Sequence, residues 1–106
     1  MTITTHVLDT ARGRPAAGVP VVLERAVGQR WEPVGRGVTD ADGRARELGP
    51  ASGAGRYRLT FDTAAHLGAE AFFPHVTVEF QVGEGEDRLH VPLLLSPFGY
   101  STYRGS

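Results

Sequence analysis

The chain has 106 residues, of which 41% are hydrophobic and 22% charged, a length and composition typical of one globular domain, which we expect to span residues 1–106. All eleven basic residues are Arg, and twelve acidic residues bring the formal charge to −1, so the overall charge favours neither nucleic acid nor an anionic membrane as a partner. The chain has no Cys and no Lys, which excludes thiol chemistry, thiolate metal sites and a lysine Schiff base.

Alternation of apolar and polar side chains predicts a series of short β-strands. In chain order the strands are expected at residues 2–8, 19–25, 30–36, 56–62, 75–82 and 89–95, with a strand-prone tail at 100–104. The alternation is strictest at 56–62, where Tyr57, Leu59 and Phe61 share one face. Pro92 has no N–H to give to a strand ladder, so the strand at 89–95 is expected to lie at a sheet edge or to be bulged there.

Turn residues separate the predicted strands, and only one helix is indicated. The turn segments are the Gly-rich loops at 13–18 and 49–55, an Asx-type turn at 40–43 and an acidic hairpin loop at 83–87. Asp62 or Thr63 is placed to cap a short helix over residues 64–67, which ends near Gly68. Seven or eight short strands with one helical turn or two predict an antiparallel β-sandwich.

The four histidines lack the spacing of a metal site, which leaves imidazole chemistry as the alternative to a structural role. His6 and His90 each lie mid-strand on the less apolar face, either as ordinary strand residues bonded to a backbone carbonyl or as functional groups. His66 is predicted to be a solvated helix residue, and His75 a residue on the polar face of its strand.

Arg44 and the C-terminal segment are further candidates. Arg44 follows the turn at 40–43, so its guanidinium is either a solvated loop charge or a group that projects from the hairpin rim to bind a planar anion or a pair of carbonyls bidentately. The lead-in to the C-terminus, residues 91–100, is too apolar for an exposed tail. It predicts that the C-terminus is docked against its own sheet or another subunit.

Four separated segments of the chain resemble the 5-hydroxyisourate hydrolase family, the transthyretin-related enzymes of urate breakdown. They are Thr4-Thr5-His6-Val7-Leu8-Asp9-Thr10 with Gly13-Arg14-Pro15-Ala16, then Thr39-Asp40-Ala41-Asp42-Gly43-Arg44, then Phe72-Phe73-Pro74, and the tail from His90-Val91-Pro92 to Tyr103-Arg104-Gly105-Ser106. The ending Tyr-Arg-Gly-Ser is typical of the hydrolases and distinguishes them from the hormone carrier transthyretin, which keeps the fold without that ending.

The resemblance implies an all-β, transthyretin (prealbumin)-like antiparallel β-sandwich of two four-stranded sheets with one short helix. It also implies a homotetramer, a dimer of dimers, whose active sites lie at a channel between subunits. The reaction is the hydrolysis of 5-hydroxyisourate, a small-molecule substrate, to 2-oxo-4-hydroxy-4-carboxy-5-ureidoimidazoline. No cofactor and no metal are expected.

Carried over residue by residue, the resemblance implies that four residues are catalytic, namely His6, Arg44, His90 and Ser106. It implies that the substrate is bound by His6, Arg44, Tyr103, Arg104 and Gly105. In this reading the two histidines activate water jointly and Arg44 offsets the developing charge, while Tyr103 and Ser106 orient substrate or water. Two positions depart from the family pattern: Arg88 stands where the family often has His, and Phe98 where it usually has Tyr.

Two other functions fit the same fold. A transthyretin-like carrier would hold a small ligand without chemistry, but it would need neither paired imidazoles nor the Tyr-Arg-Gly-Ser ending. A structural β-sandwich of an extracellular array is disfavoured because the sequence lacks a basic segment followed by an apolar run, the pattern that would indicate secretion. No stretch of the sequence is apolar for long enough to span a bilayer, and we expect a cytoplasmic protein.

Overall fold

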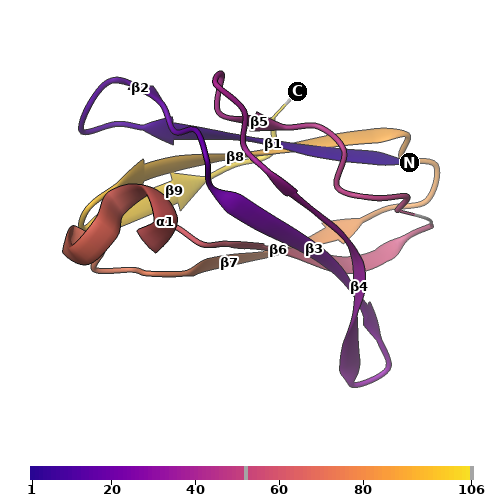
Figure 1. The fold of residues 1–106 in the computed structure, drawn as a ribbon. Coiled ribbons are helices and arrows are strands. Elements are labelled where there is room, and N and C mark those ends of the chain that lie inside the picture. Colours follow the sequence, from indigo (N-terminus) through magenta and orange to yellow (C-terminus); the bar gives the residue numbers. More distant parts are fainter. Residues whose placement is uncertain (52, 106) are drawn as a thin grey trace.

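The computed structural model describes residues 1–51 and 53–105, which form two sheets packed face to face (Figure 1). The elements in chain order are β1 (Thr2–Asp9), β2 (Arg14–Pro15), β3 (Pro20–Val27), β4 (Arg30–Val38), β5 (Arg44–Ala45), β6 (Gly55–Phe61), α1 (Ala64–Leu67), the 3-10 turn η1 (Gly68–Glu70), β7 (Val76–Val82), β8 (Arg88–Ser96) and β9 (Gly99–Thr102). One sheet has the order β2-β1-β8-β9, with β5 also paired to β1, and the other has the order β4-β3-β6-β7.

The core lies between the sheets and follows the predicted alternation. Tyr57, Leu59 and Phe61 on β6 are fully buried, as are Leu93 and Leu95 on β8. Alternate residues of a strand point to opposite faces, so the intervening side chains of each strand point away from the core. For the strands of the first sheet, that outward face carries both histidines singled out from the sequence.

The sandwich prediction is confirmed, with one difference in strand direction. Each sheet contains a path of four strands, and the two-residue β5 adds a fifth strand to the first sheet. β1 and β8 run parallel, from the pair Thr2 and Arg88 to the pair Asp9 and Leu95, whereas every other pairing of the described strands is antiparallel. Parallel neighbours need a long crossover connection, and here the whole second sheet separates them along the chain.

The expectation that the strand at 89–95 lies at a sheet edge or is bulged at Pro92 is wrong, because β8 keeps a continuous register with β1 through that residue. β8 is a central strand, with β1 on one side and β9 on the other. β9 ends at Thr102, opposite Leu93, so the β8–β9 ladder stops before Pro92. No ladder partner therefore needs the N–H that the proline lacks. The Thr102 hydroxyl instead donates to the Pro92 carbonyl at 2.7 Å. The chain therefore accommodates the proline by interrupting the ladder between β8 and the tail.

The helix is confirmed at residues 64–67, but its surroundings differ from the prediction. The Thr63 hydroxyl does not cap it and donates to the Phe73 carbonyl. His66 is not a solvated residue, because its Nε2 lies 2.7 Å from Oδ2 of the buried Asp9 on β1. The short helix is thereby tied to the end of the first sheet (Figure 1). His75, by contrast, is exposed, although it precedes β7 and does not lie on the polar face of that strand as expected.

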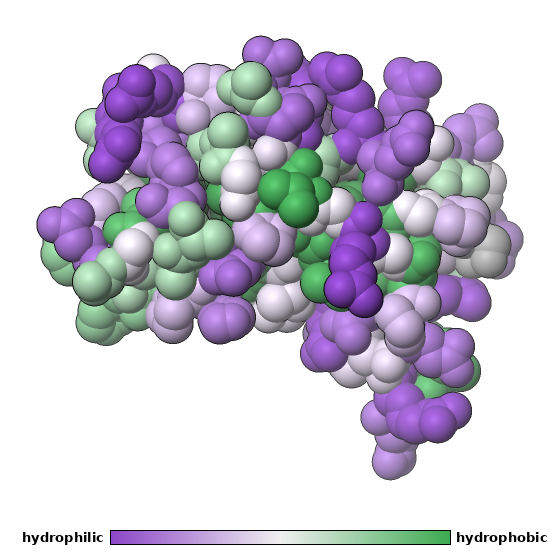
Figure 2. All heavy atoms as spheres, viewed as in Figure 1, coloured by the Kyte–Doolittle hydropathy of each residue, from purple (hydrophilic) through white to green (hydrophobic). Residues whose placement is uncertain are grey.

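Polar side chains cover the projecting end of the β3–β4 hairpin, and apolar surface shows mainly toward the middle of the molecule (Figure 2). No helix within the described part of the chain is long and apolar enough to cross a membrane. The apolar C-terminal segment is docked against its own sheet through the pairing of β9 with β8, as one of the two sequence expectations required.

Candidate active site

The candidate site lies on the outward face of the β2-β1-β8-β9 sheet. Thr4 and His6 on β1 point away from the core because their neighbours Ile3, Thr5 and Val7 are buried in it. In the ladder, His6 stands opposite Arg44 of β5 on one side and Pro92 of β8 on the other. Thr4 stands opposite His90. The topology therefore brings His6, Arg44 and His90 together from three strands that are distant in sequence.

The turn before β5 places Arg44 on this face. Oδ1 of Asp40 accepts hydrogen bonds from the backbone N–H groups of Asp42 at 2.9 Å and Arg44 at 3.0 Å. The bond from Arg44 is the main cause that holds the pKa of the Asp40 carboxyl below its usual value. Gly43 has φ +77°, and a Cβ there would lie 2.4 Å from the Val7 carbonyl oxygen, so the turn requires glycine.

His6 is held in one orientation by the same turn. Its Nε2 lies 2.8 Å from the Asp42 carbonyl oxygen. A carbonyl can only accept, so Nε2 of His6 carries the proton and donates it. The lone pair of a neutral His6 is therefore on Nδ1. The rings of His6 and His90 lie with centroids 6.5 Å apart, close enough for both to contact one small ligand.

His90 has a different environment. Its Nδ1 lies 2.8 Å from the Thr4 hydroxyl, which can either donate or accept. Burial lowers the pKa of His90, and the positive charge of Arg44 and the neighbouring His6 lower it further. A histidine with a lowered pKa is neutral at neutral pH. When Nδ1–H donates to Thr4, the Nε2 lone pair is free to accept a proton.

A cavity of about 340 Å³ opens beside these groups, and its lining residues include two that sequence reasoning placed in the site and several that it missed. They are Thr2, Thr4, Thr5, Arg44, Arg46, Arg88 and His90. Thr4 and Arg46 were missed, although both have the same strand parity as His6 and Arg44. Once β1 is paired with β5 and β8, that parity is the signal that would have found them. A neutral imidazole beside arginines can activate water and stabilise a developing negative charge.

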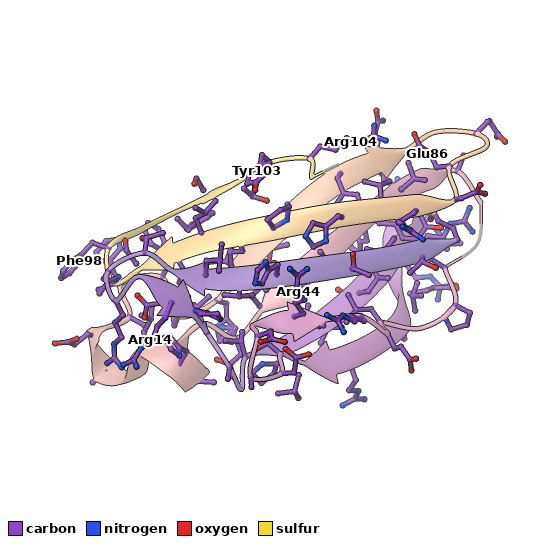
Figure 3. All side chains as sticks on the ribbon, turned by 90° about the horizontal axis from the view of Figure 1, so that it is seen from above. Arg14, Arg44, Glu86, Phe98, Tyr103 and Arg104 are labelled. Atoms are coloured by element: carbon purple, nitrogen blue, oxygen red, sulfur yellow. The ribbon has the colours of Figure 1, made fainter. Side chains whose placement is uncertain are left out.

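The structure places the C-terminal residues in different surroundings. The Gly105 N–H donates to the His90 carbonyl at 2.8 Å, so the tail runs beside the site. Arg104 points away from it and binds both carboxylate oxygens of Glu86, at 3.0 and 3.1 Å (Figure 3). Tyr103 and Arg104 line a separate cavity of about 310 Å³ along β7 and β8. Ser106 lies outside the described residues.

The two departures from the family pattern also have places in the structure. Arg88 lines the cavity with His90, while Phe98 is 78% exposed in the turn between β8 and β9, away from Arg44 (Figure 3). Within residues 1–51 and 53–105, no three His, Asp or Glu side chains are grouped so that they could hold a metal ion.

Comparison with known proteins assigns the chain to a family. The family model described as the HIUase/Transthyretin family matches residues 3–105. The chain belongs to this family. Among its curated relatives are the 5-hydroxyisourate hydrolase of Salmonella dublin, 44% identical over 98% of this chain and 80% of that protein, and the 5-hydroxyisourate hydrolase of Mus musculus, 45% identical over 98% of this chain and 94% of that protein.

Solved structures of the HIUase/Transthyretin family confirm the fold. The 5-hydroxyisourate hydrolase of Klebsiella pneumoniae matches with a TM-score of 0.84 at 43% identity, over 99% of this chain and 98% of that one. Sea bream transthyretin in complex with thyroxine matches with a TM-score of 0.89 at 33% identity, over 97% and 93%. A hydrolase and a transthyretin solved with bound thyroxine thus share this backbone, so the side chains of the site must discriminate between functions.

Proposed function

We propose that this chain is a metal-free hydrolase, acting as a single domain over residues 1–106, that opens the six-membered ring of 5-hydroxyisourate. The observation that carries the proposal is the cavity lined by His90 and Arg44, with the ring of His6 6.5 Å from that of His90 and His90 held neutral. The curated names of relatives that cover nearly the whole chain support the same reaction. A ligand carrier has no need for an imidazole poised to accept a proton.

In the proposed mechanism His90 is the general base. Its Nε2 takes a proton from water as the water oxygen attacks the ring amide carbonyl carbon. The carbonyl π electrons move to oxygen and give a tetrahedral oxyanion. When that oxyanion collapses, the amide C–N bond breaks and the protonated His90 returns its proton to the leaving nitrogen. The ring-opened product therefore contains the atoms of the substrate and of one water molecule, with a new carboxyl group where the amide carbonyl was.

Arg44 and His6 bind and stabilise the reacting group. The Arg44 guanidinium is planar and permanently charged, so it pairs with substrate carbonyls and offsets the negative charge that develops on oxygen. His6 is an unsuitable base through Nε2, because that atom already donates to Asp42. When the ring is neutral, its Nδ1 carries the lone pair and can accept a hydrogen bond from the substrate or from water. His6 therefore serves to orient the substrate or the attacking water.

We place Tyr103, Arg104, Gly105 and Ser106 in the complete site as residues that bind or orient substrate across an interface between subunits. β4, β7 and β9 are edge strands, and edge strands are the usual places for pairing with another chain. Phe98, Tyr100 and Tyr103 beside the β9 edge are exposed aromatic side chains, which supports a homotetramer built by pairing this edge. Light scattering tests the assembly, with four times the 11.4 kDa chain mass expected. A cytoplasmic location stays a prediction.

The direct test is the ultraviolet decay of 5-hydroxyisourate generated in the cuvette by urate oxidase. Catalytic acceleration at enzyme concentrations far below that of the substrate is the expected result. Deletion of residues 104–106 should slow turnover, and a normal rate in that variant would show the tail to be structural only. A folded oligomer that binds oxopurine anions without accelerating the decay would favour the carrier function instead.

A further inference from the structure

Three arginines share the cavity with His90, and two of them have no part in the mechanism above. Arg44, Arg46 and Arg88 all line it. None of the three forms an ion pair within residues 1–51 and 53–105, whereas Arg12, Arg30, Arg56, Arg58 and Arg104 each do. Cationic side chains that converge on a cavity without carboxylate partners there create a site for an anion.

The strand register separates Arg46 and Arg88 from Arg44. Arg44 lies opposite His6. Arg46 is the residue after the end of β5, and because β5 runs antiparallel to β1, it lies toward Thr4. Arg88 lies opposite Thr2, two residues before His90 on the same outward face of β8. The two extra arginines therefore lie on opposite sides of β1 near His90, whereas Arg44 lies opposite His6 in the ladder.

The acidic groups nearby do not neutralise this arrangement. Oδ1 of Asp40 is engaged by two backbone N–H groups, and the carboxyl feels the charges of Arg46 and Arg44 without a direct ion pair to either. Glu47 lines two neighbouring surface hollows, one together with Arg46 and Gly49 and the other together with Arg46 and Ala45. It does not line the cavity of His90. The charged side chains that line the cavity beside His90 are all arginines.

The geometry points to a carboxylate-binding subsite formed by Arg46 and Arg88 at the His90 end of the cavity, distinct from the oxyanion position at Arg44. This assignment of ligand rests on the proposed function, because ring opening beside His90 creates a carboxylate where none existed. Planar guanidinium groups bind a planar carboxylate through paired, charge-assisted hydrogen bonds. Arg46 and Arg88 are thereby specificity residues: they favour amide-rich rings that carry, or acquire, a carboxylate.

The subsite can be tested by binding alone, with two stable probes that differ in a single group. Orotate is a planar ring of amide groups with a carboxylate, and uracil is the same ring without it. Isothermal titration of the intact oligomer is expected to show orotate binding about tenfold more tightly than uracil. In Arg46→Gln and in Arg88→Gln this preference should fall by about threefold each, with uracil affinity unchanged, and in the double variant it should disappear.

The matched control is Arg36→Gln, an exposed arginine of β4 on the other sheet with no ion pair among the described residues. It should keep the orotate preference of the wild type, and all variants should keep the same melting temperature because the side chains removed are exposed. Raising the salt concentration should weaken orotate binding in the wild type more than in the double variant.

Equal binding of orotate and uracil by the wild type, or an orotate preference that survives in the double variant, would overturn the subsite. Neither result would bear on turnover of 5-hydroxyisourate, which the cuvette assay measures separately. Conversely, loss of the orotate preference in the double variant of a protein that fails to hydrolyse 5-hydroxyisourate would leave the subsite standing in a carrier. The two proposals can therefore fail independently.

Discussion

The backbone N–H of Gly105 donates to the His90 carbonyl at 2.8 Å and brings the tail into contact with the imidazole of the same residue. A Cβ added at Gly105 would lie 2.7 Å from Cδ2 of His90. The ladder between β8 and the tail is interrupted at Pro92, so this bridge ties the end of the described chain to the candidate base. Position 105 is thus a glycine because a side chain there has no room beside His90, and not because the backbone needs the flexibility of glycine.

Gly105→Ala is expected to displace the His90 ring and slow turnover. Misplacing a reacting group by about 1 Å can cost on the order of 100-fold in rate, so a loss of kcat/KM of about 10- to 100-fold is the expected range. Gly83→Ala is the control, because nothing lies within 4 Å of a Cβ at that position. Equal rates of 5-hydroxyisourate decay in the two variants would show that the tail does not position His90.

His90→Asn should abolish turnover while leaving the assembly intact. The amide keeps much of the shape of the ring and can still bond to Thr4, but it cannot accept a proton at neutral pH. General base catalysis is typically worth about 10²–10⁴ in rate, and a loss of that size is expected. The cuvette assay gives the rate and light scattering gives the mass of the oligomer. A near wild-type rate would remove His90 from its role as base.

The pH dependence of kcat/KM should reveal the coupling between Arg44 and His90. Burial is the largest cause that lowers the pKa of His90, and the charge of Arg44 is the next. Protonated His90 cannot act as a base, so the wild type should stay active to below the usual histidine pKa of about 6.5. Arg44→Gln should lower the rate and also move this acidic limb to higher pH.

Arg36→Gln is the control for the pH experiment, since it removes an arginine from the other sheet and leaves His90 untouched. Its acidic limb should coincide with that of the wild type. If the limb of Arg44→Gln also coincides with it, the group that titrates in the profile is not His90, and the assignment of the base would pass to His6.

Local patterns predicted most of the fold because they report which side of each strand is buried. Tyr57, Leu59 and Phe61 alternate without exception and are all in the core. The same parity put His6 and His90 each on the outward face of its own strand, but it could not tell which strands are neighbours. Only the parallel pairing of β1 with β8 places Thr4 against His90, a contact between residues 86 positions apart.

The remaining errors come from contacts between distant segments. The sequence of the short helix did not predict a contact between His66 and Asp9, because Asp9 is the last residue of β1, 57 positions away along the chain. Arg104 shares the Tyr-Arg-Gly-Ser ending with Gly105, yet Glu86 draws it away from the cavity. Glu86 lies in the loop at 83–87, which is not the hairpin loop expected from the sequence, because the strands that it joins, β7 and β8, belong to different sheets.

The Asp9–His66 contact should control stability in acid. Burial alone would raise the pKa of Asp9, but hydrogen bonds from His66 and from the Arg12 backbone N–H outweigh it and leave the pKa below its usual value. A lowered carboxyl pKa contributes stability above the unfolded value of about 3.9, and this stability is lost as the pH falls through the folded value. His66→Ala removes a donor from a carboxylate that is 2% exposed.

The free energy of unfolding of His66→Ala, measured in urea at pH 7, should therefore fall by about 1–3 kcal/mol, the cost of leaving a buried group short of a partner. Acid unfolding should begin at a higher pH than in the wild type, because the pKa of Asp9 rises when its donor is lost. His75→Ala removes an exposed histidine and should change neither quantity. Equal stabilities for the two variants would mean that Asp9 is satisfied without His66, through the backbone N–H and the guanidinium of Arg12.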